Sequence, residues 1–110
     1  MTAAATEFVQ PLTFSALTRF PVAVDLWNKD QSTDSPIGTR HVNLATWCDV
    51  MVIAPASANT MAKIATGMAD NLLTVLALAC RKPLLLAPTM DADMYLNDAT
   101  QHNLAVLKER

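Results

Sequence analysis

The stretch "VIAPASANTMAKIATGMADNLL", residues 52–73, changes character twice within a few positions. An apolar run ends at Pro55, small and polar residues occupy positions 56–60, and a helix-like pattern begins at once. The apolar run has no polar alternation, which is typical of a strand covered on both faces of a parallel sheet. A strand, a small polar turn and a helix in this order predict one unit of an α/β fold.

Two further apolar runs repeat the pattern elsewhere in the chain. The run "KPLLLAP" at 82–88 also ends in Ala-Pro, and "PVAVDLW" at 21–27 is rich in β-branched and apolar residues. Together with the run at 49–55 they predict three strands, with loops at 28–40 and 89–97, the second of which can hold a single helical turn. Helices between the strands imply right-handed crossovers, and therefore a doubly wound parallel sheet with both Ala-Pro ends on one rim.

Helical spacing of apolar residues marks five segments, at 2–19, 41–48, 59–66, 71–81 and 98–110. Pro11 either kinks the first helix or starts a second one. Gly67 is a natural helix stop, and Asp70 is expected to open the next helix. Asp98 and Gln101 stand at the spacing of a capping box.

Composition limits the classes of protein that the chain can represent. Its 110 residues suffice for one small domain, and 52% apolar with 16% charged residues can bury a core. A net charge of -2 without a basic stripe gives little support to a nucleic-acid partner. The sequence also lacks an apolar run near the roughly 18 residues of a membrane span, and a signal peptide. We therefore expect a cytoplasmic protein with no membrane partner.

The cysteines and histidines do not form a metal motif. Cys48 and Cys80 each lie in an apolar pattern outside any CxxC pair, so two buried thiols in a reducing compartment are favoured over a disulfide or a metal site. His41 and His102 have no partners at zinc-motif spacing. We expect no bound metal.

Three strands form a thin sheet for an independent domain, because both outer strands would expose parallel edges. The chain has two glycines and no glycine-rich phosphate loop after a first strand. The sequence therefore predicts either a start inside a larger domain or dependence on neighbouring chains.

Three elements resemble one known family. They are His41 at the start of a short helix, "PASANT" at 55–60 and "PTMDADMY" at 88–95. In this combination they resemble the flavin-dependent cysteine decarboxylases, most closely the phosphopantothenoylcysteine decarboxylases of coenzyme A biosynthesis. The likeness spans nearly all 110 residues.

The resemblance implies a flavodoxin-like, Rossmann-like three-layer fold, FMN bound between subunits, and trimers or multiples of trimers. It also implies decarboxylation of 4'-phosphopantothenoylcysteine to 4'-phosphopantetheine, with a phosphopantothenate-cysteine ligase either fused or separate. Residues 1–110 would then be a partial flavoprotein domain, with the first strand and its phosphate loop before Met1 and a cysteine-bearing flap after Arg110. Neither Cys48 nor Cys80 matches that flap cysteine.

The resemblance places Ser57, Ala58, Asn59 and Thr60 at the flavin. Free backbone N–H groups at a helix start favour electron-rich oxygens, and an asparagine amide can both donate and accept. Small side chains would let a flat ring approach. The alternative is that Ser57 or Asn59 is only a helix N-cap.

Four more residues follow from the same resemblance. Thr89 and Met90 would contact the cofactor, and Thr2 would lie near its phosphate. His41 corresponds to the active-site base, since an imidazole titrates near neutral pH. The alternative is a histidine that caps the helix or faces solvent.

Asp91 and Met94 would contact the substrate. The family usually has asparagine at the first of these positions, whereas a carboxylate only accepts hydrogen bonds and repels a substrate carboxylate. The alternative for Asp91 and Asp93 is two solvated carboxylates or a cap for the next helix. Two other functions stay open, namely a peptidyl-cysteine decarboxylase and a non-catalytic flavoprotein-like subunit.

Overall fold

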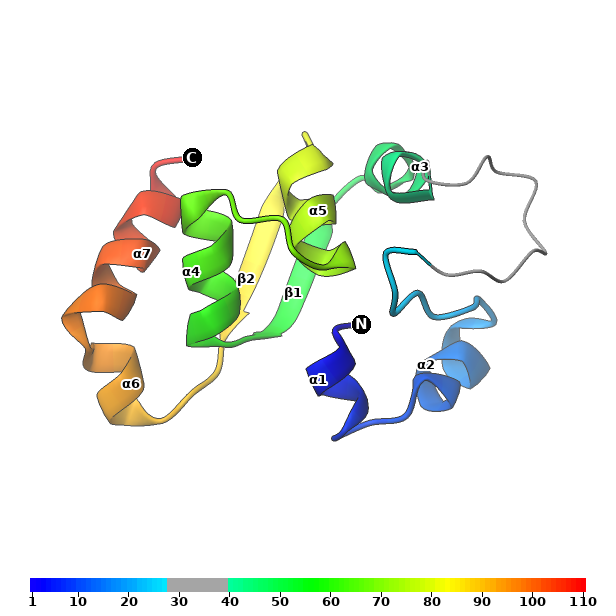
Figure 1. Cartoon of the computed structure of the whole chain (residues 1–110), viewed down its shortest axis with the longest axis horizontal. Helices are drawn as coiled ribbons and strands as arrows, with labels where there is room; N and C mark the ends of the chain where they lie inside the picture. Colours follow the sequence, from blue (N-terminus) through cyan, green and yellow to red (C-terminus); the bar gives the residue numbers. More distant parts are fainter. Residues whose placement is uncertain (28–39) are drawn as a thin grey trace.

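The structure is a computed structural model that describes residues 1–27 and 40–110. The loop expected at 28–40 therefore falls, except for its last residue, outside the described residues. The elements in chain order (Figure 1) are α1 Ala3–Thr6, α2 Pro11–Thr18, α3 Arg40–Trp47, β1 Met51–Ala56, α4 Ala58–Thr66, α5 Leu72–Ala79, β2 Leu84–Pro88, α6 Ala92–Leu96 and α7 Asp98–Lys108. In the part of the chain that the structure describes, no helix is both long enough and apolar enough to cross a membrane.

β1 and β2 form a parallel pair, as the two Ala-Pro runs predict. The paired residues are Met51 with Leu84, Val52 with Leu85, Ile53 with Leu86 and Ala56 with Pro88. The register shifts between Ile53 and Ala56, where Pro55 has no N–H to donate to a regular ladder. The shift leaves the last residues of both strands side by side.

The expectation of a strand at 21–27 is wrong. Residues 21–25 have no regular secondary structure, and no other described segment pairs with them in a sheet. Their recorded contact is a 2.6 Å hydrogen bond from the Met1 amino group to the carbonyl of Ala23. β-Branched residues favour a strand only where a neighbouring edge offers hydrogen bonds, and this segment meets none.

One face of the sheet carries the core. Ile53 and Ala56 from β1 are buried against Met61 and Ile64 from α4, and the Met61 side chain is fully buried. Partly buried side chains from α5, α7 and both strands pack around this cluster, among them Leu73, Ala77, Leu84, Leu104 and Leu107. Figure 1 shows α4 and α5 in front of the strands, with α7 beside α4. The three helices thus form one layer.

The opposite face of the sheet is exposed, so the expectation that both faces are covered is wrong for this chain. Val52 and Leu85, which pair across the sheet, are each 57% exposed. Ala54 and Ala87 on the same face are exposed as well. No element within 1–27 or 40–110 supplies a second layer there. The apolar runs therefore predicted the two strands correctly. A layer over the second face of the sheet, which they also predicted, is absent from the described residues.

Local start and stop signals set most helix ends. Pro11 begins α2 and divides the single helix expected at 2–19 into two. Gly67 ends α4 with φ of 74°, in the left-handed region that a residue without Cβ enters freely. Both of these positions confirm a sequence-based expectation.

Two expected caps are displaced by one residue. Asn71, not Asp70, caps α5: its side chain accepts from the Thr74 N–H at 3.0 Å, while the Thr74 hydroxyl accepts from the Asn71 N–H at 3.2 Å. Asn97, not Asp98, caps α7 by accepting from the N–H of Ala99 at 3.0 Å. An asparagine next to a competing aspartate takes the cap in both cases: Asn71 follows Asp70, and Asn97 precedes Asp98.

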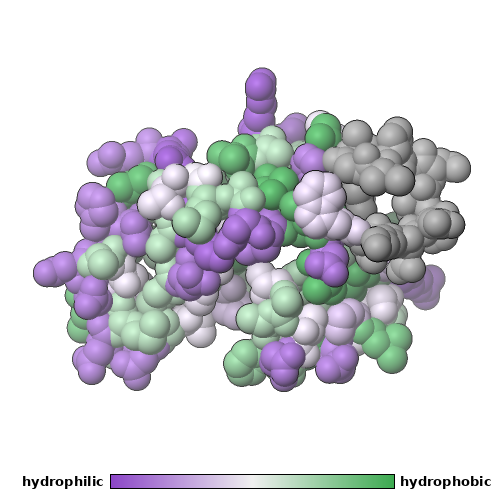
Figure 2. Space-filling model, in the orientation of Figure 1, coloured by the Kyte–Doolittle hydropathy of each residue, from purple (hydrophilic) through white to green (hydrophobic). Residues whose placement is uncertain are grey.

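Apolar side chains remain on the surface of the N-terminal region. Phe8 is 88% exposed and Leu17 is 77% exposed, and neither α1 nor α2 contains a buried residue. The ring of Phe20 contacts that of Trp47, the last residue of α3, with centroids 6.5 Å apart. Figure 2 shows hydrophobic side chains on the surface around α2 and between α3 and α5, whereas hydrophilic side chains surround α6 and α7.

Candidate functional site

The two loops of interest meet at the carboxyl edge of the sheet. Ala56 pairs with Pro88, and the N–H of Thr89 donates to the carbonyl of Ala56 at 3.1 Å. This bond continues the ladder past the strand ends. The segment "PASANT" and the segment "PTMDADMY" therefore form one rim, as the rule for parallel sheets predicts.

The first half of the rim is the N-terminus of α4. Ser57 is its N-cap: the hydroxyl accepts from the N–H of Thr60 at 3.3 Å and lies 3.2 Å from the Thr60 hydroxyl. Ser57 and Asn59 are exposed. The N–H groups of Ala58 and Asn59 have no hydrogen-bond partner among the described residues, as expected in a first helical turn. This end therefore presents free donors at the positive end of the helix dipole.

The second half of the rim is the turn from β2 into α6. Thr89 is exposed and its hydroxyl lies 3.4 Å from the carbonyl oxygen of Ala87. Met90 is half-buried and packs against the core cluster. Asp91 caps α6 by accepting from the N–H of Asp93 at 3.0 Å. In the structure Asp91 thus acts as a helix cap, which was the alternative to a substrate contact.

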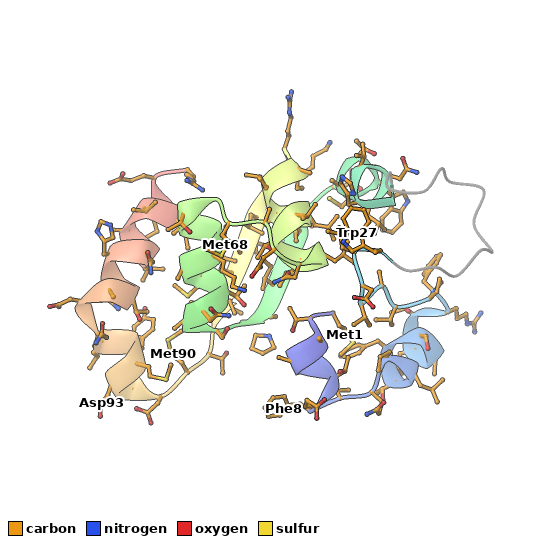
Figure 3. The ribbon with its side chains drawn as sticks, viewed as in Figure 1. Met1, Phe8, Trp27, Met68, Met90 and Asp93 are labelled. Atoms are coloured by element: carbon orange, nitrogen blue, oxygen red, sulfur yellow. The ribbon has the colours of Figure 1, made fainter. Side chains whose placement is uncertain are left out.

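Two side chains of α6 extend the rim outward. Met94 is exposed, and Tyr95 is also exposed while its carbonyl accepts from the Gln101 amide at 2.6 Å. In Figure 3, Met90 lies where the chain enters α6 and Asp93 at the outer side of that helix. The turn thus offers a thioether, a phenol and carboxylates to solvent on one short segment.

His41 and Thr2 lie away from this rim. His41 is the second residue of α3, which leads into the amino end of β1, whereas the rim is at its carboxyl end (Figure 1). The imidazole is half-buried and has no hydrogen bond to another described residue. Thr2 caps α1 by accepting from the N–H of Ala5 at 3.2 Å. One chain therefore brings together Ser57, Thr60 and Asp91, but does not bring His41 to them.

A cavity lies at the other end of α4. It has a volume of about 30 Å³ and is lined by Ile64 of α4, by Met68 just after that helix, by residues of α5 such as Leu78, and by the C-terminal residue. The guanidinium of Arg110 donates to the carbonyls of Ile64 and Ala65 at 2.9 and 3.0 Å and closes this end of the helix. A space that holds about one water molecule cannot enclose a tricyclic ring. This cavity is therefore too small to be the site of a flat ligand.

The cysteines form a cluster that sequence spacing does not reveal. Cys48 follows α3 and Cys80 follows α5, yet their Sγ atoms are 3.5 Å apart. Both thiols are free and half-buried, not fully buried as expected. Residues 32 positions apart meet because α3 packs against α5, and no local motif signals that contact. Within the described ranges, no group of three or more His, Cys, Asp or Glu residues is arranged to hold a metal ion.

Known proteins resemble the whole chain. The profile of the Flavoprotein family matches residues 1–110. A Cysteine/Cysteine sulfinic acid decarboxylase from an unknown prokaryotic organism is 43% identical over 100 residues, which cover 91% of this chain and 27% of that protein. The coenzyme A biosynthesis bifunctional protein CoaBC of Vibrio cholerae serotype O1 is 44% identical over 110 residues, covering 100% of this chain and 27% of that protein. The chain thus spans about a quarter of the length of these relatives.

Solved structures show the same arrangement of elements. The FMN-dependent cysteine decarboxylase SpaF superposes with a TM-score of 0.86 at 38% identity, covering 99% of this chain and 59% of that one. A PPC decarboxylase mutant complexed with pantothenoylaminoethenethiol gives 0.64 at 45% identity, covering 76% and 44%. The fold is therefore the doubly wound, flavodoxin-like α/β fold, of which the described residues contain two parallel strands. With a family profile matched from its first residue to its last, the chain belongs to the Flavoprotein family.

Proposed function

We propose that this chain is the flavin-binding part of an FMN-dependent decarboxylase that converts 4'-phosphopantothenoylcysteine to 4'-phosphopantetheine in coenzyme A biosynthesis. The observation that carries the proposal is the rim, where the start of α4 and the turn after β2 are joined by the 3.1 Å bond from Thr89 to Ala56. Support for the reaction comes from relatives named as decarboxylases and as coenzyme A biosynthesis proteins.

The residues of the rim fit the chemistry of a flavin edge. Ring oxygens and nitrogens need donors, and the free N–H groups of Ala58 and Asn59 provide two at the positive end of α4. The exposed amide of Asn59 can donate or accept, which suits a mixed edge. The small side chain of Ala58 lets a ring approach the backbone. Ser57, Thr60, Thr89 and Met90 would complete the contact.

When bound, FMN supplies a two-electron acceptor for oxidation of the substrate's cysteine and returns the electrons after carbon dioxide is lost. The chain's own residues position the substrate and move protons. His41 would accept the proton of the substrate thiol, because a neutral imidazole is a base near neutral pH. Met94 and Asp91 would contact the substrate from the exposed turn.

The separation of His41 from the rim favours an oligomer. Because α3 lies at the amino end of β1, His41 of one copy would serve the rim of another. A homotrimer, or a multiple of trimers, satisfies this requirement by repeating one contact around a closed ring. Thr2 would lie near the FMN phosphate. A phosphopantothenate-cysteine ligase, fused or separate, is the proposed partner in the cytoplasm.

The first test is flavin binding by the full chain. Titration with FMN should quench flavin fluorescence, and Asn59→Ala should weaken binding about tenfold, the loss of one to two hydrogen bonds. Asn103→Ala, on α7 away from the rim, is the matched control and should bind as the parent does. Equal binding by Asn59→Ala and the parent would reject the rim as the flavin site.

The second test is carbon dioxide release from phosphopantothenoylcysteine by the FMN-loaded protein. His41→Asn should lower the rate at least a hundredfold while FMN binding is retained. His102→Asn, on the exposed side of α7, is the control and should keep the parent rate. If His41→Asn released carbon dioxide at the parent rate, His41 would not be the active-site base.

The substrate itself needs a separate test. Phosphopantothenoylcysteine and a peptide with a C-terminal cysteine both carry a cysteine carboxylate, which an ionised Asp91 in direct contact would repel equally. We propose that Asp91 keeps its position as the cap of α6, so it does not discriminate between the two. Release of carbon dioxide from a cysteine-terminated peptide but not from phosphopantothenoylcysteine would establish the peptidyl-cysteine alternative. Protein that binds FMN and releases no carbon dioxide from either would be the non-catalytic subunit.

A further inference from the structure

The contact between Cys48 and Cys80 joins two separate helices. Cys48 directly follows α3, and Cys80 is the C-cap of α5. Their Sγ atoms lie 3.5 Å apart, and the Cys48 thiol lies 3.5 Å from the carbonyl of Ala45 one turn earlier. Because α3 packs against α5, the helix interface brings the two sulfur atoms together.

The pair is within reach of a covalent bond. A disulfide has an S–S distance of about 2.05 Å, so the sulfur atoms need to approach by about 1.5 Å. Both residues stand just past the last turn of a helix, where side-chain rotation and small backbone shifts meet little resistance. Both are half-buried, so a small oxidant in solution has access to the pair.

In the reduced protein the hydrogen bond with Cys80, together with burial, holds the pKa of the Cys48 thiol above its usual range. Lys82, two residues after Cys80, acts in the opposite direction. The thiolate is the species that attacks a disulfide. The raised pKa lowers the fraction of Cys48 that is thiolate, so we expect exchange with a disulfide to become faster as the pH rises.

We propose that Cys48 and Cys80 are a redox modification site, which closes to a disulfide with small-molecule disulfides of the glutathione class and reopens with thiols. The thiolate of one cysteine attacks glutathione disulfide, forms a mixed disulfide and releases one glutathione thiolate. The second cysteine, after losing its proton to solvent, attacks the protein sulfur of that bond and releases the second glutathione. Two protein thiols are oxidised and one glutathione disulfide is reduced to two thiols.

The closed disulfide fastens α3 to α5. It encloses the segment from 48 to 80, which includes β1 and α4, and it limits the freedom of that segment in the unfolded chain. The helix that it fastens is the one that carries His41. The site is independent of any bound flavin, since neither cysteine belongs to the rim.

The test is peptide mapping of the full chain after incubation with glutathione disulfide. Trypsin cleaves after Arg40, Lys63 and Arg81, so the proposal expects peptides 41–63 and 64–81 linked by a disulfide. Dithiothreitol should separate them, and the intact chain should be two hydrogen atoms lighter before reduction. Cys48→Ser and Cys80→Ser should each give a single glutathione adduct and no linked peptides. Adducts alone in the parent chain, or links between two chains, would overturn the proposal.

Thermal unfolding provides a second measurement that is independent of mapping. Oxidation should raise the Tm of the parent chain by roughly 5–15 °C, and dithiothreitol should reverse the rise. The rise should be the same across a tenfold range of protein concentration, because the bond is within one chain. Neither serine variant should show it. An unchanged or lower Tm after complete oxidation would show that the two sulfurs do not meet without disrupting the helix interface, and would overturn the proposal.

Discussion

Residues 51–108 and residues 1–27 use apolar side chains in opposite ways. In the later region, Met61 is 0% exposed and Ile53 is 3% exposed, because two strands and three helices meet around them. In the earlier region α1 and α2 are of similar apolar character but contain no buried residue. The difference shows that apolar content does not make a core without partners that close around it. In residues 51–108 the helices and strands cover one another's apolar side chains. In residues 1–27 no described element covers those of α1 and α2.

The largest expected effect comes from removing a core side chain. Met61→Ala should lower the free energy of unfolding by about 2–5 kcal/mol, because it leaves a cavity between the sheet and α4. Leu12→Ala, at an exposed position of α2, should change it by no more than ~0.5 kcal/mol. Urea denaturation of both variants measures the contrast. Similar losses for the two would mean that the earlier region is packed as tightly as the later one.

A smaller effect is expected from helix caps. Asn71→Ala removes the reciprocal cap of α5, a helix with buried residues, and should cost about 1 kcal/mol. Thr2→Ala removes a similar cap from the four-residue α1, which buries nothing, and should leave the unfolding midpoint unchanged. The midpoints of urea unfolding, measured for both variants and the parent without added flavin, test this difference. If Thr2→Ala were the more damaging change, α1 would be part of the cooperative core.

The smallest effect concerns the ion pair that joins α4 to the start of α5. Lys63 lies 2.5 Å from Asp70, and its hydrogen bond holds the pKa of that carboxyl below its usual range. The unfolded pKa, near 3.9, is therefore higher than the folded one, so the pair stabilises the protein above about pH 4. That contribution disappears as the pH falls through the folded pKa. Asp70→Asn should be slightly less stable than the parent at neutral pH.

Urea midpoints measured at descending pH provide the check on this pair. The gap between Asp70→Asn and the parent should close in acid, and it should also shrink in high salt, because both residues are partly exposed. A gap that widened in acid would reverse the sign of the coupling. Asp98→Asn, at an exposed position of α7, is the matched change without an ion pair in the described structure.

Much of the later region could be predicted from sequence because its signals are local. The runs that end at Pro55 and Pro88 predicted β1 and β2, and the rule for parallel sheets placed their ends together. Gly67 predicted the end of α4. Caps were off by one residue because an asparagine and an aspartate stand side by side at both helix starts, and the two residue types cap about equally well.

The sequence-based expectations that were wrong concern features that depend on contacts between distant segments. The run at 21–27 has strand composition, but no edge lies beside it to make it a strand. Val52 and Leu85 have the residue types of a doubly covered sheet and are exposed on one side. The proximity of Cys48 and Cys80 arises from helix packing and has no counterpart in sequence spacing. For the candidate site, the sequence located the rim correctly, while the roles of its residues stay predictions.

The hydrogen bond from Thr89 to Ala56 has a mechanical consequence. It lies just beyond the paired strands, where loops ordinarily move separately, and it links the two loop bases to each other through the backbone. A shift of the turn before α6 is thereby transmitted to the start of α4, and among substitutions at position 89 only proline, which has no N–H, removes the link. The bases of the two loops are consequently expected to move together as one unit.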